Sequence, residues 1–155
     1  MEKQRTVLGN LLERLEELID LSDRKNTAVS KASVGWHIAH TLITMGGILD
    51  LLEQSDPKSL TGRINLAGWL TLKLGWIPKG RGKAPRVARP EGQIDPQRLQ
   101  KKVTSTKEKL DMLSTLDPNA YFKHPYFGEL KLKWAIRFIE VHTKHHLKIM
   151  ESILK

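Results

Sequence analysis

Two histidines occupy core positions in the last predicted helix of this chain. His142 and His146 are four residues apart, so on a helix they stand one turn apart on the same face. They belong to a series that advances in steps of three and four, the pattern of the inward-facing seam of a bundle helix: Leu132, Ala135, Ile139, His142, His146, Ile149 and Ile153. Burying imidazole nitrogens without partners is costly. The pair therefore predicts either a metal site or a hydrogen-bonded network inside a helical protein.

The same periodicity predicts helices along the rest of the chain. We expect helices over residues 2–22, from a cap at Ser30 or Ser33 to about Gln54, over 59–75 and over about 95–116, and a last long helix from about Leu130. Residues 120–128 are expected to form a connector, and no stretch shows a strand pattern. The prediction is an all-α fold: a four-helix bundle with one additional shorter helix, in a single domain that spans residues 1–155.

The amino-acid composition excludes several kinds of functional site. The chain has 155 residues and no cysteine, which excludes disulfides, thiolate metal sites and a thiol nucleophile of its own. Any thiol chemistry would need a small-molecule thiol. The formal net charge of +9 permits binding to nucleic acid, anionic membranes or anionic small molecules without choosing among them.

A basic loop follows the shorter helix. Residues 76–90 hold three prolines, two glycines, five basic residues and no acidic one, and they show no core pattern. We predict that Lys79–Arg89 is mobile and lies near the mouth of the site, where its charges would suit an anionic substrate or cosubstrate. A loop that only improves solubility is the alternative.

An uncharged stretch of eighteen residues lies between Lys31 and Asp50 and raises the question of a membrane span. It contains two histidines, a serine, two threonines and three glycines, so we interpret it as a buried bundle helix. We expect no membrane partner and a cytoplasmic protein, and a homodimer is left open.

One helix supplies two ligands, whereas a catalytic metal site of this kind usually has three from the protein. The second predicted helix contains a candidate for the third. The run Ala32-Ser33-Val34-Gly35-Trp36-His37-Ile38-Ala39-His40-Thr41-Leu42 is similar to the second-helix motif of the DinB/YfiT-like metalloenzymes, with His40 at the ligand position. The run from Val141 to Ile149 resembles the last-helix motif of that family, with His142 and His146 at ligand positions. A branch of the family with unknown function also carries a Pro-Lys-Gly loop and a His-Pro-Tyr-Phe-Gly connector, which match residues 78–80 and 124–128.

The resemblance implies a four-helix bundle that binds a divalent metal, nickel or zinc, through His40, His142 and His146, with positions left open for water. It implies a metal-dependent enzyme that activates water or a low-molecular-weight thiol, as a hydrolase or a thiol S-transferase. The substrate would be a small molecule, and an anionic thiol is one candidate. His37, His145 and His124 are candidates for contacting a ligand or moving a proton. His124, which starts the connector, could instead fix a turn.

Two other functions remain open. The bundle could bind metal in a stress-related role without turnover. The third and weakest hypothesis is a basic nucleic-acid-associated protein, which rests on net charge alone.

Overall fold

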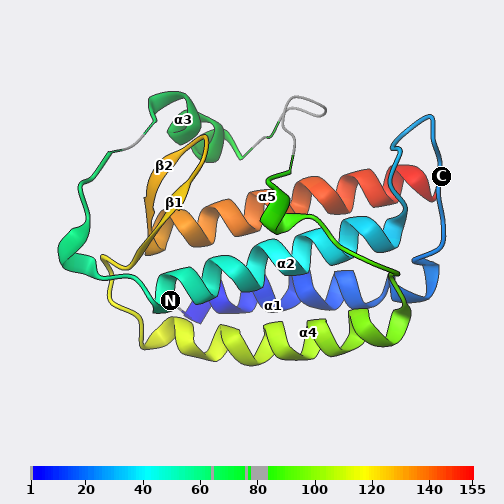
Figure 1. Ribbon diagram of the computed structural model, residues 1–155, viewed down its shortest axis with the longest axis horizontal. Coiled ribbons are helices and arrows are strands. Elements are labelled where there is room, and N and C mark those ends of the chain that lie inside the picture. The colour runs from blue at the N-terminus through cyan, green and yellow to red at the C-terminus, as the bar shows by residue number, and fades with distance from the viewer. Residues whose placement is uncertain (1, 64, 76, 78–83) are drawn as a thin grey trace.

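The computed structural model describes residues 2–63, 65–75, 77 and 84–155. Four long helices lie side by side in a bundle: α1 (Glu2–Glu16), α2 (Val34–Glu53), α4 (Pro96–Leu110) and α5 (Leu132–Ile153) (Figure 1). Helices α1 and α2 each pack against both α4 and α5. The predicted all-α bundle with one shorter helix, α3 (Leu66–Leu74), is confirmed.

The bundle core is built mainly from leucine, isoleucine and valine at the periodic positions. Leu8, Leu12, Ile38, Leu42 and Ile139 are among the side chains with at most 1% exposure. Caps set two helix starts: Ser33 accepts a hydrogen bond from the Trp36 amide, and Asp95 accepts one from the Arg98 amide, with Pro96 next to it. None of the helices within the described residues combines the length and apolarity that a membrane crossing requires.

The connector contains a small β-hairpin, which the sequence pattern did not predict. Strands β1 (Tyr121–His124) and β2 (Gly128–Lys131) pair antiparallel, with Phe122 opposite Leu130. Each strand has only four residues, too few for an alternating pattern to stand out. In Figure 1 the hairpin and α3 lie together at one end of the bundle, beside α5.

Three predicted helix boundaries differ from the structure. Helix α1 ends at Glu16 instead of residue 22, and a 3-10 turn, Ile19–Leu21, buries Ile19 beyond it. Helix α4 ends at Leu110 and continues as a 3-10 turn, Asp111–Ser114.

Helix α3 begins at Leu66 instead of residue 59, after a 3-10 turn over Pro57–Ser59. The buried carboxylate of Glu129 accepts hydrogen bonds from the Thr61 amide, the Thr61 hydroxyl and the Gly62 amide. These bonds hold the chain in a non-helical conformation, and Gly62 has a positive φ of 71°.

Candidate metal centre

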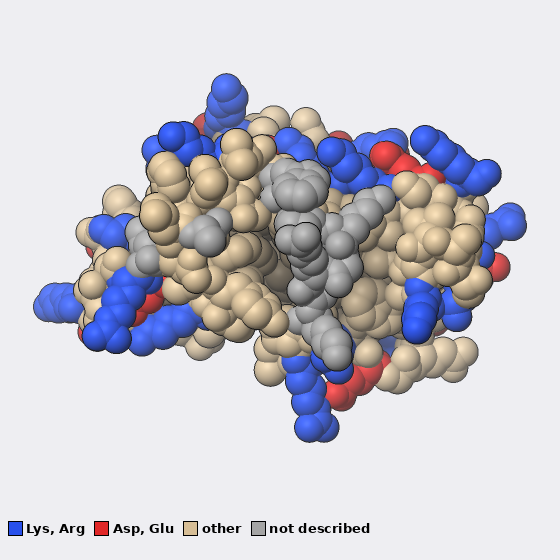
Figure 2. Space-filling model, turned by 90° about the horizontal axis from the view of Figure 1, so that it is seen from above, with Lys and Arg blue, Asp and Glu red and all other residues tan. Residues whose placement is uncertain are grey.

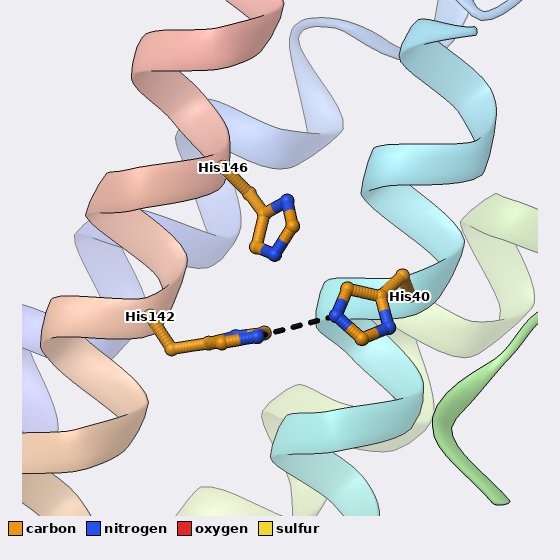
Figure 3. Close-up of side chains that lie close together, drawn as sticks. All are labelled: His40, His142 and His146. Carbon is orange, nitrogen blue, oxygen red and sulfur yellow. Dashed lines mark hydrogen bonds between the residues drawn. The ribbon is translucent and has the colours of Figure 1, made fainter. Parts of the chain in front are cut away.

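Three histidines from two helices meet inside the bundle. His40 comes from α2, and His142 and His146 come from neighbouring turns of α5 (Figure 3). One ring nitrogen from each lies within 4.8 Å of the other two, and the Nε2 atoms of His40 and His142 are 3.2 Å apart. His40 is 4% exposed and His146 is 9% exposed. The fold therefore brings together the three residues that the sequence predicted.

His40 is oriented by a backbone carbonyl. Its Nδ1 lies 2.7 Å from the carbonyl oxygen of Ala88, which sits in a 3-10 turn, Arg86–Ala88. A carbonyl oxygen only accepts, so Nδ1 of His40 carries the proton and its Nε2 presents a lone pair to the other two histidines. The indole of Trp36 stacks on the ring, with centroids 5.1 Å apart and planes 17° apart, and limits its rotation.

The tautomer of His40 determines how His142 is protonated in the absence of metal. Because Nε2 of His40 accepts, Nε2 of His142 donates across the 3.2 Å that separates them. To bind a metal through Nε2, His142 would have to adopt its other neutral tautomer, with the proton on Nδ1. The ring of Phe138 stacks on His142, with centroids 5.4 Å apart, and supplies an apolar wall.

His146 is held by a fourth histidine. Its Nδ1 lies 2.9 Å from Nδ1 of His37, and Nε2 of His37 lies 3.0 Å from the hydroxyl oxygen of Ser30. In Figure 3 the other ring nitrogen of His146, Nε2, points toward the space between His40 and His142. The sequence made His37 a candidate for contacting one of the metal-binding histidines, and the structure places it in contact with His146.

Burial keeps these imidazoles neutral. Burial lowers the pKa of His40, and the hydrogen bond to Ala88 offsets only part of this effect. Burial also lowers the pKa of His142 and His146 well below the ordinary value, and repulsion by neighbouring histidines adds to the effect. The pKa of His37 falls to about 4 for the same reasons. Metal binding needs unprotonated imidazole, so the site is ready for a cation at neutral pH.

The donor set fits a divalent transition metal. Two nitrogens each bound about 2.0–2.1 Å from a tetrahedral ion lie roughly 3.4 Å apart, close to the 3.2 Å between His40 and His142. Three neutral imidazoles suit zinc, nickel, copper or iron better than magnesium or calcium, which prefer oxygen ligands. The three histidines could therefore hold one such ion.

The two remaining histidine candidates occupy different places. His145 is half-buried beside the site, with its ring centroid 5.2 Å from that of His146. His124 fixes the hairpin turn, because its Nδ1 accepts hydrogen bonds from the amides of Tyr126 and Phe127 at 3.1 and 3.2 Å. Its ring stacks on Phe127, and burial lowers its pKa to about 4.

The basic loop reaches the site through its second part. Lys79–Lys83, with the neighbouring Pro78, lie outside the described residues, whereas residues 84–89 supply the Ala88 carbonyl that contacts His40. Arg86 and Arg89 are exposed. Mobility of the loop stays a prediction. No sequence pattern points to the Ala88 contact, because a carbonyl group is common to every residue.

A separate surface cavity of about 240 Å³ lies between α1, α3 and α5. Its lining includes Leu72, Trp134, Arg137 and Glu140, and none of the three clustered histidines takes part. Glu140 pairs with Arg137 and Lys144, at 2.9 and 2.6 Å. We therefore assign the chemistry to the histidine cluster.

Comparison with known proteins supports a relationship over nearly the whole chain. The model of the DinB superfamily matches residues 3–150, which include all three clustered histidines. No curated protein and no solved structure matches the chain.

Proposed function

The chain belongs to the DinB superfamily, and from this membership and the histidine cluster we propose that it is a metal-dependent enzyme. We propose that Nε2 of His40, His142 and His146 bind one divalent ion, nickel or zinc. The observation that carries the proposal is the meeting of three neutral imidazole nitrogens, from α2 and α5, within 4.8 Å.

The ion would supply Lewis-acid chemistry, lowering the pKa of a water or a thiol that binds it, so that a nucleophile forms near neutral pH. With no cysteine in the chain, a thiol nucleophile would come from a small molecule. We therefore propose hydrolysis or transfer of a low-molecular-weight thiol as the reaction.

The chain's own residues orient the ligands and limit water. The Ala88 carbonyl accepts a hydrogen bond from His40, and Nδ1 of His37 would accept one from Nδ1 of His146 when the metal is bound. The rings of Trp36 and Phe138 pack on His40 and His142. His145, half-buried beside His146, is our candidate for moving a proton between the site and solvent.

Equilibrium dialysis against nickel and zinc tests the metal proposal. We expect one ion per chain in the wild type and strongly reduced content in His40→Ala, His142→Ala and His146→Ala, with helicity retained in far-UV circular dichroism. His145→Ala is the matched control and should keep its metal. Loss of metal in His145→Ala with retention in His146→Ala would overturn the ligand assignment.

Turnover separates the candidate reactions. The loaded protein is incubated with a panel of esters and a panel of electrophiles plus small anionic thiols. In cobalt-substituted protein, a thiol that binds the ion should change the visible absorption, and an unchanged spectrum at roughly millimolar thiol would remove thiol transfer. Metal binding without any turnover would support the non-catalytic alternative.

A further inference from the structure

Helix α3 presents leucines to solvent. Leu66, Leu70 and Leu74 are 78%, 49% and 69% exposed, and their spacing of four places them along one stripe. The buried side of the same helix carries Leu72, which is 0% exposed. An outward stripe of three leucines reverses the usual pattern of a surface helix, and contiguous exposed apolar surface of this kind marks an interaction site.

The same part of the chain carries nearly all of its excess charge. Between Asp56 and Glu91 there are eight lysines and arginines and no acidic residue, so this segment accounts for +8 of the net +9. The described cations of the segment are all exposed: Lys58, Arg63, Lys73, Arg86 and Arg89.

Two further large apolar side chains are exposed. Val87, in the same segment, is 88% exposed. Tyr126, in the hairpin turn, is 57% exposed, and the adjacent Phe127 contacts α3 at Gly68. Figure 2 looks onto the side of the molecule on which α3 lies in Figure 1, and shows uncharged surface with many blue lysine and arginine side chains and fewer red acidic ones around it.

Charge and apolarity together select the kind of partner. A second copy of this chain docking face to face would bring two segments of +8 together, and like charges repel. Nucleic acid would neutralise the cations but would leave the leucine stripe in water. An anionic lipid surface satisfies both features, because leucines enter the headgroup boundary while lysine and arginine meet the lipid charges.

We propose that the exposed face of α3, with the described cations Lys58, Arg63, Lys73, Arg86 and Arg89, binds the surface of anionic membranes. The protein would rest on the bilayer without crossing it. This revises the expectation of no membrane partner, which rested on the absence of a spanning segment. The proposal is independent of the metal site.

Vesicle co-sedimentation of the full chain tests this. The vesicles are equal parts phosphatidylglycerol and phosphatidylcholine, or phosphatidylcholine alone. We expect binding to the anionic vesicles only, weakened by salt, and weaker by about tenfold or more in the Leu66→Ser/Leu74→Ser variant, which loses two exposed apolar side chains. Val29→Ser is the matched control, because Val29 is 40% exposed but lies outside the basic segment. Circular dichroism and thermal unfolding confirm that each variant is folded.

Four results would overturn the proposal. The first is no binding to anionic vesicles at low salt. The second is binding that the leucine variant retains in full, which would mean adsorption by charge alone. The third is tighter binding to duplex DNA at equal phosphate concentration, unaffected by the leucine changes. The fourth is a wild-type dimer that the leucine changes convert to a monomer, which would assign the face to a second copy.

Discussion

The Nδ1 atoms of His37 and His146 lie 2.9 Å apart inside the bundle, and this contact decides which nitrogen His146 can offer to a metal. One of the two atoms must donate a proton and the other must accept it. If His146 donates, its Nε2 keeps a lone pair for the metal, and His37 donates from Nε2 to Ser30. If His37 donates instead, Nε2 of the neutral His146 carries the proton and cannot bind. Metal binding at this site therefore requires His37 to act as the acceptor.

Removing this acceptor should weaken metal binding without unfolding the bundle. We expect His37→Leu to lower the affinity about 10- to 100-fold, the usual effect of losing a hydrogen-bond partner of a ligand. His37→Asn, whose side-chain oxygen can accept near the same position, should lose less. Competition with a chromophoric chelator measures both affinities, and equal affinity in wild type and His37→Leu would contradict the role of His37.

Acid should destabilise the metal-free protein. Burial lowers the pKa of His37 and of His124 to about 4, below the ordinary value of 6.5, so between these values the unfolded chain binds more protons than the folded one. Above pH 6.5 both histidines are neutral in the folded and the unfolded chain, and the free energy of unfolding is at its highest. It falls as the pH drops toward 4, by on the order of 1 kcal/mol per pH unit for each residue. Urea unfolding at pH 7, 6 and 5 measures the trend, and constant stability over this range would contradict it.

His124 should stabilise the hairpin through the two amides that it accepts. His124→Phe keeps an aromatic ring against Phe127 and Phe138 but has no acceptor for the amides of Tyr126 and Phe127. We expect a loss of about 1–2 kcal/mol at pH 7. The variant should also lose less stability than the wild type between pH 6.5 and 5, because a titrating group has been removed. Unfolding curves at pH 7, 6.5 and 5 check this, and an unchanged stability at pH 7 would contradict the role of the acceptor.

Close packing between α3 and the hairpin should make Gly68 intolerant of a side chain. A Cβ atom there would lie 2.3 Å from a ring carbon of Phe127 and 3.0 Å from the Phe127 Cα, so Gly68→Ala should cost about 1–3 kcal/mol. Gly9→Ala is the control in α1, where an added Cβ meets nothing within 4 Å and should stabilise by up to about 1 kcal/mol. Chemical denaturation of both variants checks the opposite signs; the same sign in both would contradict the packing.

The sequence predicts the parts of this molecule that depend on local pattern. Leucine periodicity indicates the long helices, and the four-residue spacing of His142 and His146 puts them on one face of α5. The match of His40 to a family motif supplied the third histidine. Contacts between distant segments were not predicted. The contact of His37 with His146 and that of His40 with the Ala88 carbonyl leave no local pattern in the sequence.

The hairpin and the start of α3 were not predicted from the sequence for a related reason. The buried Glu129 of β2 fixes Thr61 and Gly62 through hydrogen bonds across 67–68 residues of sequence. A tertiary contact therefore keeps Thr61 and Gly62 out of the helix that the periodicity predicted. The boundary of α1 differs similarly, since Ile19 is buried from a 3-10 turn instead of a continued helix.

X-ray absorption of the nickel- or zinc-loaded protein at the metal edge tests the central claim most directly, because it counts the imidazoles around the ion. We predict a first shell with three imidazole nitrogens at about 2.0–2.1 Å for zinc. The His146→Ala variant, loaded with excess metal, should lose one imidazole from that shell, and His145→Ala should leave it unchanged. A bound ion whose shell contains no imidazole, or an unchanged shell in His146→Ala, would contradict the account.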